Sequence, residues 1–127
     1  MEIVGIGTEI VECVRIGRMI QEHGELFLAR VFTAKEMRHC QKRKSPTEHF
    51  AGQWAAKEAV LKALGIQSAK GLAWTDLEIV HVTGQGPKVH LHGRIKDHAQ
   101  QQCVSEILVA MAQCRAYATA YAIALKA

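Results

Sequence analysis

The sequence predicts an α+β fold in a single domain, with a mostly antiparallel sheet packed with helices. With 127 residues, the chain can bury one sizeable core but is too short for two ordinary domains, so we expect one domain over residues 1–127. Hydrophobic residues make up 49% and charged residues 22%, which indicates a globular rather than a disordered chain. Strand and helix patterns do not alternate strictly, and this favours an antiparallel α+β arrangement over a doubly wound sheet.

The first half of the chain has the pattern of one strand followed by helices. Residues 3–11 are apolar and rich in strand formers, although Gly5 and Gly7 interrupt them. Thr33 and Glu36 have the spacing of a capping box at the start of a helix. Residues 50–63 combine good helix formers without proline. We expect a strand over 3–11, a helix near 11–22, a short helix after Thr33 to about Gln41, a loop over 42–48, and a helix over 50–63 that ends near Gly65.

The second half has the pattern of two strand pairs around a helix. Residues 83–86 contain two glycines between strand-like segments, which is a hairpin signal. We expect a loop over 69–75, strands over 76–82 and 87–92, a helix over 94–102, and strands over 104–113 and 117–125. The last segment is rich in alanine, so a helix is an open alternative there.

The charge balance narrows the classes of partner. A net charge of +4 suits a phosphorylated small molecule, an acidic protein or a nucleic acid, and charge alone does not separate the three. Aromatic residues make up 6% and are not interleaved with the basic ones, so we expect no nucleic-acid partner. The sequence contains no Gly-x-x-x-x-Gly-Lys-Ser/Thr motif, which excludes a P-loop nucleotide enzyme.

Cysteine usage and hydropathy indicate the compartment. The four cysteines form no Cys-x-x-Cys pair, so we expect reduced thiols rather than a zinc site or a disulfide framework. No basic segment followed by an apolar stretch opens the sequence, and its apolar runs are far shorter than a membrane span. We therefore expect a cytoplasmic protein without a membrane partner.

Residues 50–63 carry the most specific functional signal. Glu58 and Lys62 stand four residues apart, so their charges lie side by side on one helical face. From spacing alone, an exposed ion pair worth about 0.3–0.5 kcal/mol is the more common interpretation. The whole segment, however, closely resembles the signature helix of the holo-acyl-carrier-protein synthases, a family of 4′-phosphopantetheinyl transferases. The resemblance continues in order along nearly the whole chain, through Gly5-Ile6-Gly7-Thr8-Glu9, Phe32-Thr33-x-x-Glu36, Gly86-Pro87-x-Val89 and Tyr117-Ala118-Thr119-Ala120.

This resemblance implies the fold and the reaction of the family. A serine of an apo acyl carrier protein attacks the β-phosphorus of coenzyme A, the 4′-phosphopantetheine arm is transferred, and adenosine 3′,5′-bisphosphate leaves. Negative charge spreads over the pyrophosphate oxygens in the transition state, so Mg²⁺ and fixed positive groups suit this chemistry. The resemblance also implies a role in fatty acid biosynthesis, coenzyme A and an acyl carrier protein as partners, and a homotrimer with active sites between subunits.

The functional positions of the family carry over by their place in the motifs. Glu58 and Lys62 are the implied catalytic residues, and Glu9 and Glu58 are the implied magnesium ligands. The implied coenzyme-binding residues are Lys44, Lys62, Gly65, Pro87 and Gln113, and the implied carrier-protein-binding residues are Arg15, Arg18, Met19, Phe27 and Arg30. In a trimer, Glu9 and Gln113 of one copy would line a site with Glu58 and Lys62 of a neighbour.

A basic stretch precedes the signature helix, and two interpretations of it stay open. It consists of Lys35, Arg38, Lys42, Arg43 and Lys44. By resemblance, such residues recognise the 3′-phosphate of coenzyme A. A run of charges is equally often a solvated surface, and the sequence does not decide between the two.

Several positions differ from the common pattern of the family. Glu9 stands where aspartate is usual, and its extra methylene moves the carboxylate outward by roughly 1.5 Å unless the side chain folds back. Gln53 replaces an arginine, and Gln113 replaces a histidine, so that it can bind phosphate but cannot exchange a proton near neutral pH. The alternative hypothesis is therefore a catalytically impaired relative that binds coenzyme A or a carrier protein without transfer.

Overall fold

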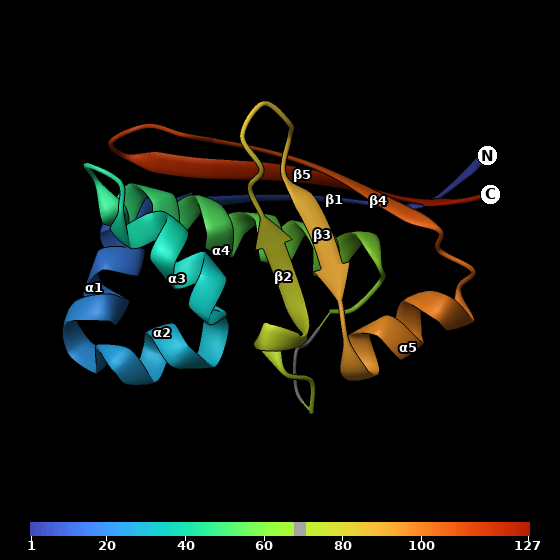
Figure 1. The fold of residues 1–127 in the computed structure, drawn as a ribbon, viewed down its shortest axis with the longest axis horizontal. Helices are drawn as coiled ribbons and strands as arrows, with labels where there is room; N and C mark the ends of the chain where they lie inside the picture. Colours follow the sequence, from blue (N-terminus) through green and yellow to red (C-terminus); the bar gives the residue numbers. More distant parts are fainter. Residues whose placement is uncertain (68–70) are drawn as a thin grey trace.

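The computed structural model describes residues 1–67 and 71–127, which form helices and two antiparallel sheets (Figure 1). In chain order the elements are β1 (Glu2–Glu12), α1 (Cys13–His23), α2 (Glu25–Val31), α3 (Ala34–Gln41), α4 (Pro46–Ala63), the 3₁₀ turn η1 (Trp74–Asp76), β2 (Leu77–Val80), β3 (Lys88–Leu91), α5 (Gly93–Gln101), β4 (Glu106–Gln113) and β5 (Tyr117–Lys126). The predicted α+β class is confirmed. The predicted loop over 69–75 lies partly outside the described residues.

The larger sheet has the strand order β1-β5-β4, and α4 lies along one of its faces (Figure 1). Alternate residues of β5 are buried on that face, and all four of them are alanines: Ala118, Ala120, Ala122 and Ala124. This period of two is that of a strand, so the helix alternative for this segment was wrong. The small side chains leave room for α4 to lie close to the sheet.

Two glycines of β1 bring this strand into direct contact with α4. A Cβ atom at Gly5 would overlap the carbonyl oxygen of Ala63, and one at Gly7 would overlap that of Ala59. Because no side chain separates the two backbones, the strand and the helix lie at their closest approach here. Glu9 is two residues beyond Gly7 and therefore projects from the same face of the strand, toward α4.

Helix α4 has a favourable residue at each of its two ends. It begins at Pro46, where a missing N–H costs nothing because the first N–H groups of a helix have no intrahelical partner. The loop predicted over 42–48 is correspondingly shorter. At the other end, Gly65 has a φ of 74°. The N–H groups of Gly65 and Ile66 donate to the carbonyls of Lys62 and Leu61, which is the hydrogen-bond pattern of a glycine-terminated helix, as predicted.

The remaining elements surround α4. Helices α1, α2 and α3 lie at one end of it, α5 lies toward the other, and the β2–β3 hairpin crosses between them (Figure 1). The sequence did not predict α2, which buries Phe27, Leu28 and Val31. Within residues 1–67 and 71–127, no helix has both the length and the apolar character that crossing a membrane requires.

A buried ion pair connects α4 to α3. The Nζ atom of Lys57 lies 2.7 Å from Oε1 of Glu36, and both side chains are fully buried. Lys57 also donates to the carbonyl oxygen of Val31 at the end of α2, over 2.6 Å. Burial lowers the pKa of Lys57, and Glu36 opposes this shift by attracting the ammonium charge. The pair is therefore satisfied in a position that would be costly for either charge alone.

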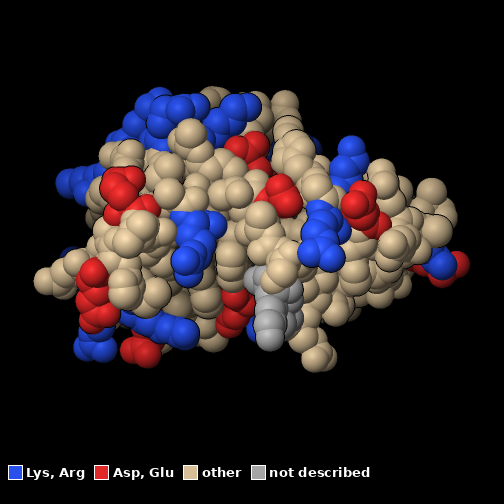
Figure 2. Space-filling view, turned by 90° about the horizontal axis from the view of Figure 1, so that it is seen from below, with Lys and Arg blue, Asp and Glu red and all other residues tan. Residues whose placement is uncertain are grey.

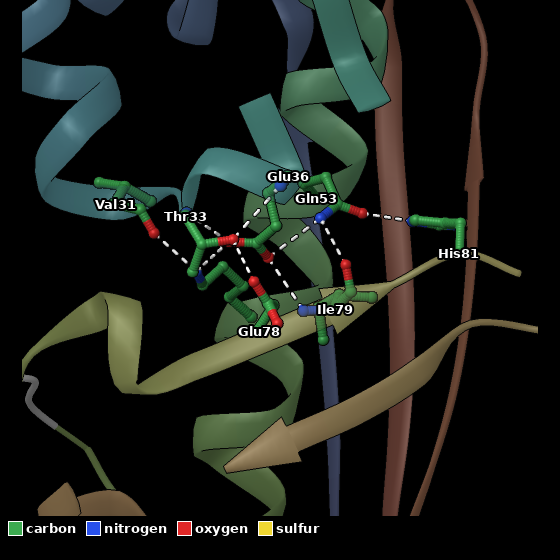
Figure 3. Close-up of polar contacts among 8 residues, drawn as sticks. Val31, Thr33, Glu36, Gln53, Glu78, Ile79 and His81 are labelled. Atoms are coloured by element: carbon green, nitrogen blue, oxygen red, sulfur yellow. Dashed lines mark hydrogen bonds and ion pairs between the residues drawn. The ribbon is translucent and has the colours of Figure 1, made fainter. Parts of the chain in front are cut away.

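Glu36 also connects the pair to the smaller sheet (Figure 3). Its Oε2 atom accepts from the Ile79 N–H and from the Gln53 side chain, each over 3.0 Å. Its Oε1 atom accepts from the Thr33 N–H, while the Thr33 hydroxyl accepts from the Glu36 N–H, so the predicted capping box is present. One carboxylate thus joins α3, α4 and β2, three elements that border a cavity.

We predict that Lys57→Met lowers the free energy of unfolding by about 3–5 kcal/mol, because it leaves the Glu36 carboxylate buried without its cation. Urea denaturation monitored by circular dichroism measures this change. Lys126→Met is the matched control, since Lys126 pairs with Glu2 at an exposed position over 3.5 Å; its loss should stay under about 1 kcal/mol. Equal effects of the two substitutions would contradict the role given to the buried pair.

Candidate active site

Glu9, Glu58 and Lys62 meet where β1 lies against α4. The Nζ atom of Lys62 lies 3.4 Å from Oε2 of Glu9 and donates to the carbonyl oxygen of Thr8 over 3.0 Å. The other carboxylate oxygen of Glu9 accepts from the N–H of Ile10 over 3.1 Å, so its side chain folds back along the strand. Glu58 and Lys62 stand one turn apart on α4. The structure therefore brings together the three residues that the resemblance assigned to metal and phosphate chemistry.

The charge of Glu9 influences the ionisation of Glu58. Partial burial raises the pKa of Glu58, and the charge of Glu9 raises this pKa further. Lys62 and Arg15 oppose the shift with their positive charges. Two carboxylates in mutual repulsion beside a single exposed lysine form a site at which an added cation is favourable.

Two aromatic side chains that sequence reasoning did not assign border this site. The guanidinium of Arg15 lies 5.8 Å from the ring centre of Trp54, a cation–π contact from α1 to α4. Trp54 stacks on Trp74 of η1 with ring centres 6.5 Å apart. Both indoles are partly exposed. They form a flat apolar surface one helical turn before Glu58, and no local signal could have shown that residues 54 and 74 are neighbours.

A separate basic cavity of about 840 Å³ opens between α3, α4 and β2. It is lined by Lys35, Arg38, His39, Lys42, Arg43, His49, Gln53, Ile79, Val80, His81, Val82, Thr83, Gln85, Pro87, Met111 and Gln113. None of these described lining residues is acidic, so the cavity favours an anion. Of the predicted coenzyme-binding residues, Pro87 and Gln113 line it. Lys44 is exposed in the loop that supplies Lys42 and Arg43, and Gly65 is exposed at the far end of α4.

Gln53 is a structural residue of this cavity wall. Its side chain is fully buried, and its Nε2 atom donates to Glu36 and, over 3.2 Å, to the carbonyl oxygen of Ile79. Its Oε1 atom is hydrogen bonded to Nε2 of His81 (Figure 3). Gln53, which stands in place of an arginine of the family pattern, therefore holds a histidine at the cavity.

The predicted carrier-binding residues lie on α1 and α2. Figure 2 shows Lys and Arg side chains gathered at the end of the molecule where α1, α2 and α3 lie. Arg15, Arg18 and Arg30 are exposed and Met19 is partly exposed. Phe27, in contrast, is buried in edge contact with Phe32, at 6.1 Å between ring centres, so it does not present its ring to a partner. Its neighbour Leu26 is 80% exposed and presents its apolar side chain to solvent.

The two parts of the candidate site are separate within one chain. None of Glu9, Glu58 and Lys62 lines the basic cavity. The expectation that Glu9 of one copy lines a site with Glu58 and Lys62 of a neighbour needs correction, since all three meet within one chain beside the glycine contact of β1. Gln113 lies at the cavity instead, close to Gly52 on α4.

Comparison with known proteins gives matches over nearly the whole chain. The family model described as the 4′-phosphopantetheinyl transferase superfamily matches residues 5–125. A holo-[acyl-carrier-protein] synthase of Rhodopirellula baltica is 48% identical over 123 residues, covering 97% of this chain and 98% of the relative. The crystal structure of the holo-[acyl-carrier-protein] synthase of Neisseria meningitidis superposes with a TM-score of 0.88 at 27% identity, covering 98% of this chain and 100% of that one. The Bacillus anthracis synthase, solved in complex with CoA (3′,5′-ADP), gives a TM-score of 0.79 at 26% identity and 98% coverage of each chain.

Proposed function

The chain belongs to the 4′-phosphopantetheinyl transferase superfamily, and on that premise we propose that it transfers the 4′-phosphopantetheine arm of coenzyme A to a serine of an apo acyl carrier protein. Adenosine 3′,5′-bisphosphate is the second product. The observation that carries this proposal is the meeting of Glu9, Glu58 and Lys62 in a protein whose relatives are named holo-[acyl-carrier-protein] synthases. We infer a cytoplasmic enzyme of fatty acid biosynthesis.

The acidic pair suits magnesium. Mg²⁺ takes oxygen ligands and keeps several waters, so it needs only one or two carboxylates in addition to the phosphates of its substrate. This requirement agrees with Glu9 and Glu58 as a pair of ligands. Bound there, the ion would neutralise charge on the pyrophosphate during transfer.

The chain's own residues have distinct tasks in this reaction. Transfer forms a bond between the serine oxygen and the β-phosphorus and breaks the bond from that phosphorus to the bridging oxygen, which leaves with the nucleotide. Lys62, beside Glu9, holds a pyrophosphate oxygen with its ammonium group. Arg15 and the stacked Trp54 and Trp74 border the path along which the pantetheine arm would extend.

The basic cavity suits the 3′-phosphate of coenzyme A. Lys35, Arg38, Lys42 and Arg43 surround it, while Pro87 and Gln113 contribute to its wall. Because phosphate oxygens are strong acceptors, several fixed cations are the expected binding groups. The exposed arginines of α1 and α2, together with Met19 and Leu26, suit the acidic surface of a carrier protein.

We predict that mass spectrometry of an apo acyl carrier protein, incubated with this protein, coenzyme A and Mg²⁺, shows a gain of the phosphopantetheine mass. Glu58→Gln should lower kcat by about 100-fold or more, since it removes a metal ligand worth several kcal/mol of charge stabilisation. Glu2→Gln, an exposed carboxylate at the other end of β1, is the control and should retain the rate. No mass gain with any carrier tested would reject transfer and favour the alternative, a relative that binds coenzyme A or a carrier protein without reaction.

A homotrimer would unite the acidic pair of one copy with the basic cavity of the next. The sheet face opposite α4 exposes Ile6, Ile10, Leu108 and Tyr121, which lie on three neighbouring strands. Such a contiguous apolar face is typical of a protein interface. The interface of a trimer would cover it and place separate parts of the site next to each other.

We predict that sedimentation equilibrium gives three chain masses for the wild type. Tyr121→Glu introduces a charge at the centre of the exposed sheet face, so it should shift the distribution to the monomer. Lys88→Glu, which introduces the same side chain on the exposed side of β3, is the control and should remain trimeric. A monomeric wild type at tens of micromolar would overturn the trimer proposal.

A further inference from the structure

The hydrogen bonds of Gln53 determine which nitrogen of His81 carries a proton. The amide nitrogen of Gln53 donates to Glu36 Oε2 and to the carbonyl oxygen of Ile79, and neither acceptor can donate in return. The amide oxygen therefore faces His81, and because it only accepts, Nε2 of His81 must be the donor. Neutral His81 thus keeps its hydrogen on Nε2 and leaves Nδ1 with a free lone pair.

His81 is stacked on a second histidine in the cavity wall. The rings of His39, from α3, and His81, which follows β2, are 4.1 Å apart and within 4° of parallel. His49 of α4 meets His39 edge-on at 6.4 Å. The other charged or polar groups of the cavity are Lys35 and Arg38 on α3, Lys42 and Arg43 after it, Gln53 on α4, Thr83 and Gln85 after β2, and Gln113 on β4.

These surroundings keep both histidines of the stacked pair neutral near pH 7 when no anion is bound. Burial lowers the pKa of His81 to about 4, with smaller contributions from His39, Arg43 and His49. The pKa of His39 is lowered for the same reasons, chiefly burial and then Arg43. Among the groups that lower the pKa of His81, Arg43 is a permanent cation, so a dianion bound beside it offsets this contribution and favours the protonated ring.

We propose that the stacked His39 and His81 recognise a phosphate dianion in the basic cavity and take up a proton as it binds. The proton comes from solvent and is added to an imidazole lone pair, at Nδ1 in the case of His81. The new N–H donates to a phosphate oxygen while Nε2–H of His81 stays on Gln53. Two stacked imidazolium rings repel each other, so one proton is shared by the pair rather than two being bound.

The identity of the ligand as the 3′-phosphate of coenzyme A rests on the proposed function, whereas proton uptake does not. By linkage, a site that gains a proton on binding has an affinity that rises as pH falls, by up to about tenfold for each pH unit. An arginine at the same place would bind phosphate equally well at all these pH values, because it is always charged. With Gln53 in place of the arginine of the family pattern, His81 thus makes recognition depend on pH.

The test uses sulfate, which stays a dianion between pH 6 and pH 8, so any pH dependence belongs to the protein. We expect the sulfate affinity of the wild type, measured by isothermal titration calorimetry, to be about tenfold or more higher at pH 6 than at pH 8. In ¹⁵N-edited NMR spectra of the protein without sulfate, His81 should be neutral with its hydrogen on Nε2. Sulfate binding should convert its ring to the doubly protonated form. The double variant His39→Asn, His81→Asn keeps a donor for Gln53 but leaves neither ring of the pair to gain a proton, so its ratio should fall to about twofold.

His23→Asn is the control, because this histidine is exposed on α1, and it should behave as the wild type. Coenzyme A should displace sulfate from this cavity, and dephospho-coenzyme A, which lacks the 3′-phosphate, should not; this pair of ligands separates the coenzyme from free phosphate. Absent sulfate binding, an affinity independent of pH, or a sulfate-bound protein in which neither His39 nor His81 is protonated would each overturn the inference. Because these measurements read binding and protonation, a failed transfer reaction would leave them unaffected.

Discussion

The direct contact between the backbones of β1 and α4 is the constraint on which the acidic site depends. It requires glycine at positions 5 and 7, since a Cβ atom there would overlap a carbonyl oxygen of the helix. The alanines of β5 extend the same close approach across the sheet. At this distance, Glu9 of the strand reaches the side of α4 that carries Glu58 and Lys62. The glycine motif therefore serves the chemistry by setting a distance between elements.

The opposite side of α4 depends on charge rather than on close backbone packing. The Glu36–Lys57 pair is fully buried and joins α3 to α4, and the second oxygen of Glu36 holds β2 through Ile79. These elements carry the histidines of the basic cavity. A pair of apolar residues could pack as tightly, but it would offer no acceptor to Gln53 and so would not orient His81. The buried charge thus specifies the geometry of an exposed site.

The sequence allowed the fold class and the family to be predicted, because these depend on local periodicity and on motifs of consecutive residues. The motifs also pointed to Glu9, Glu58 and Lys62 as residues of one site, but not to their meeting within one chain. Other features depend on contacts between distant segments. Lys57 and Gln53 belong to residue types that are usually exposed on a helix. Only the tertiary structure shows that both are buried. Phe27 was assigned to a docking surface although it packs in the core, since α2 itself was not predicted. The stacking of His39 on His81 joins residues 42 positions apart, counted as 81 minus 39, and no local pattern signals it.

The proposal that one chain holds the metal through both Glu9 and Glu58 is tested most directly by measuring the binding of Mn²⁺, which takes the place of Mg²⁺. Electron paramagnetic resonance detects the bound Mn²⁺ in the presence of coenzyme A. The account predicts that Glu9→Gln and Glu58→Gln each raise the Mn²⁺ dissociation constant by at least about tenfold, while Glu2→Gln leaves it unchanged. A Glu9→Gln variant that binds Mn²⁺ as tightly as the wild type would contradict it.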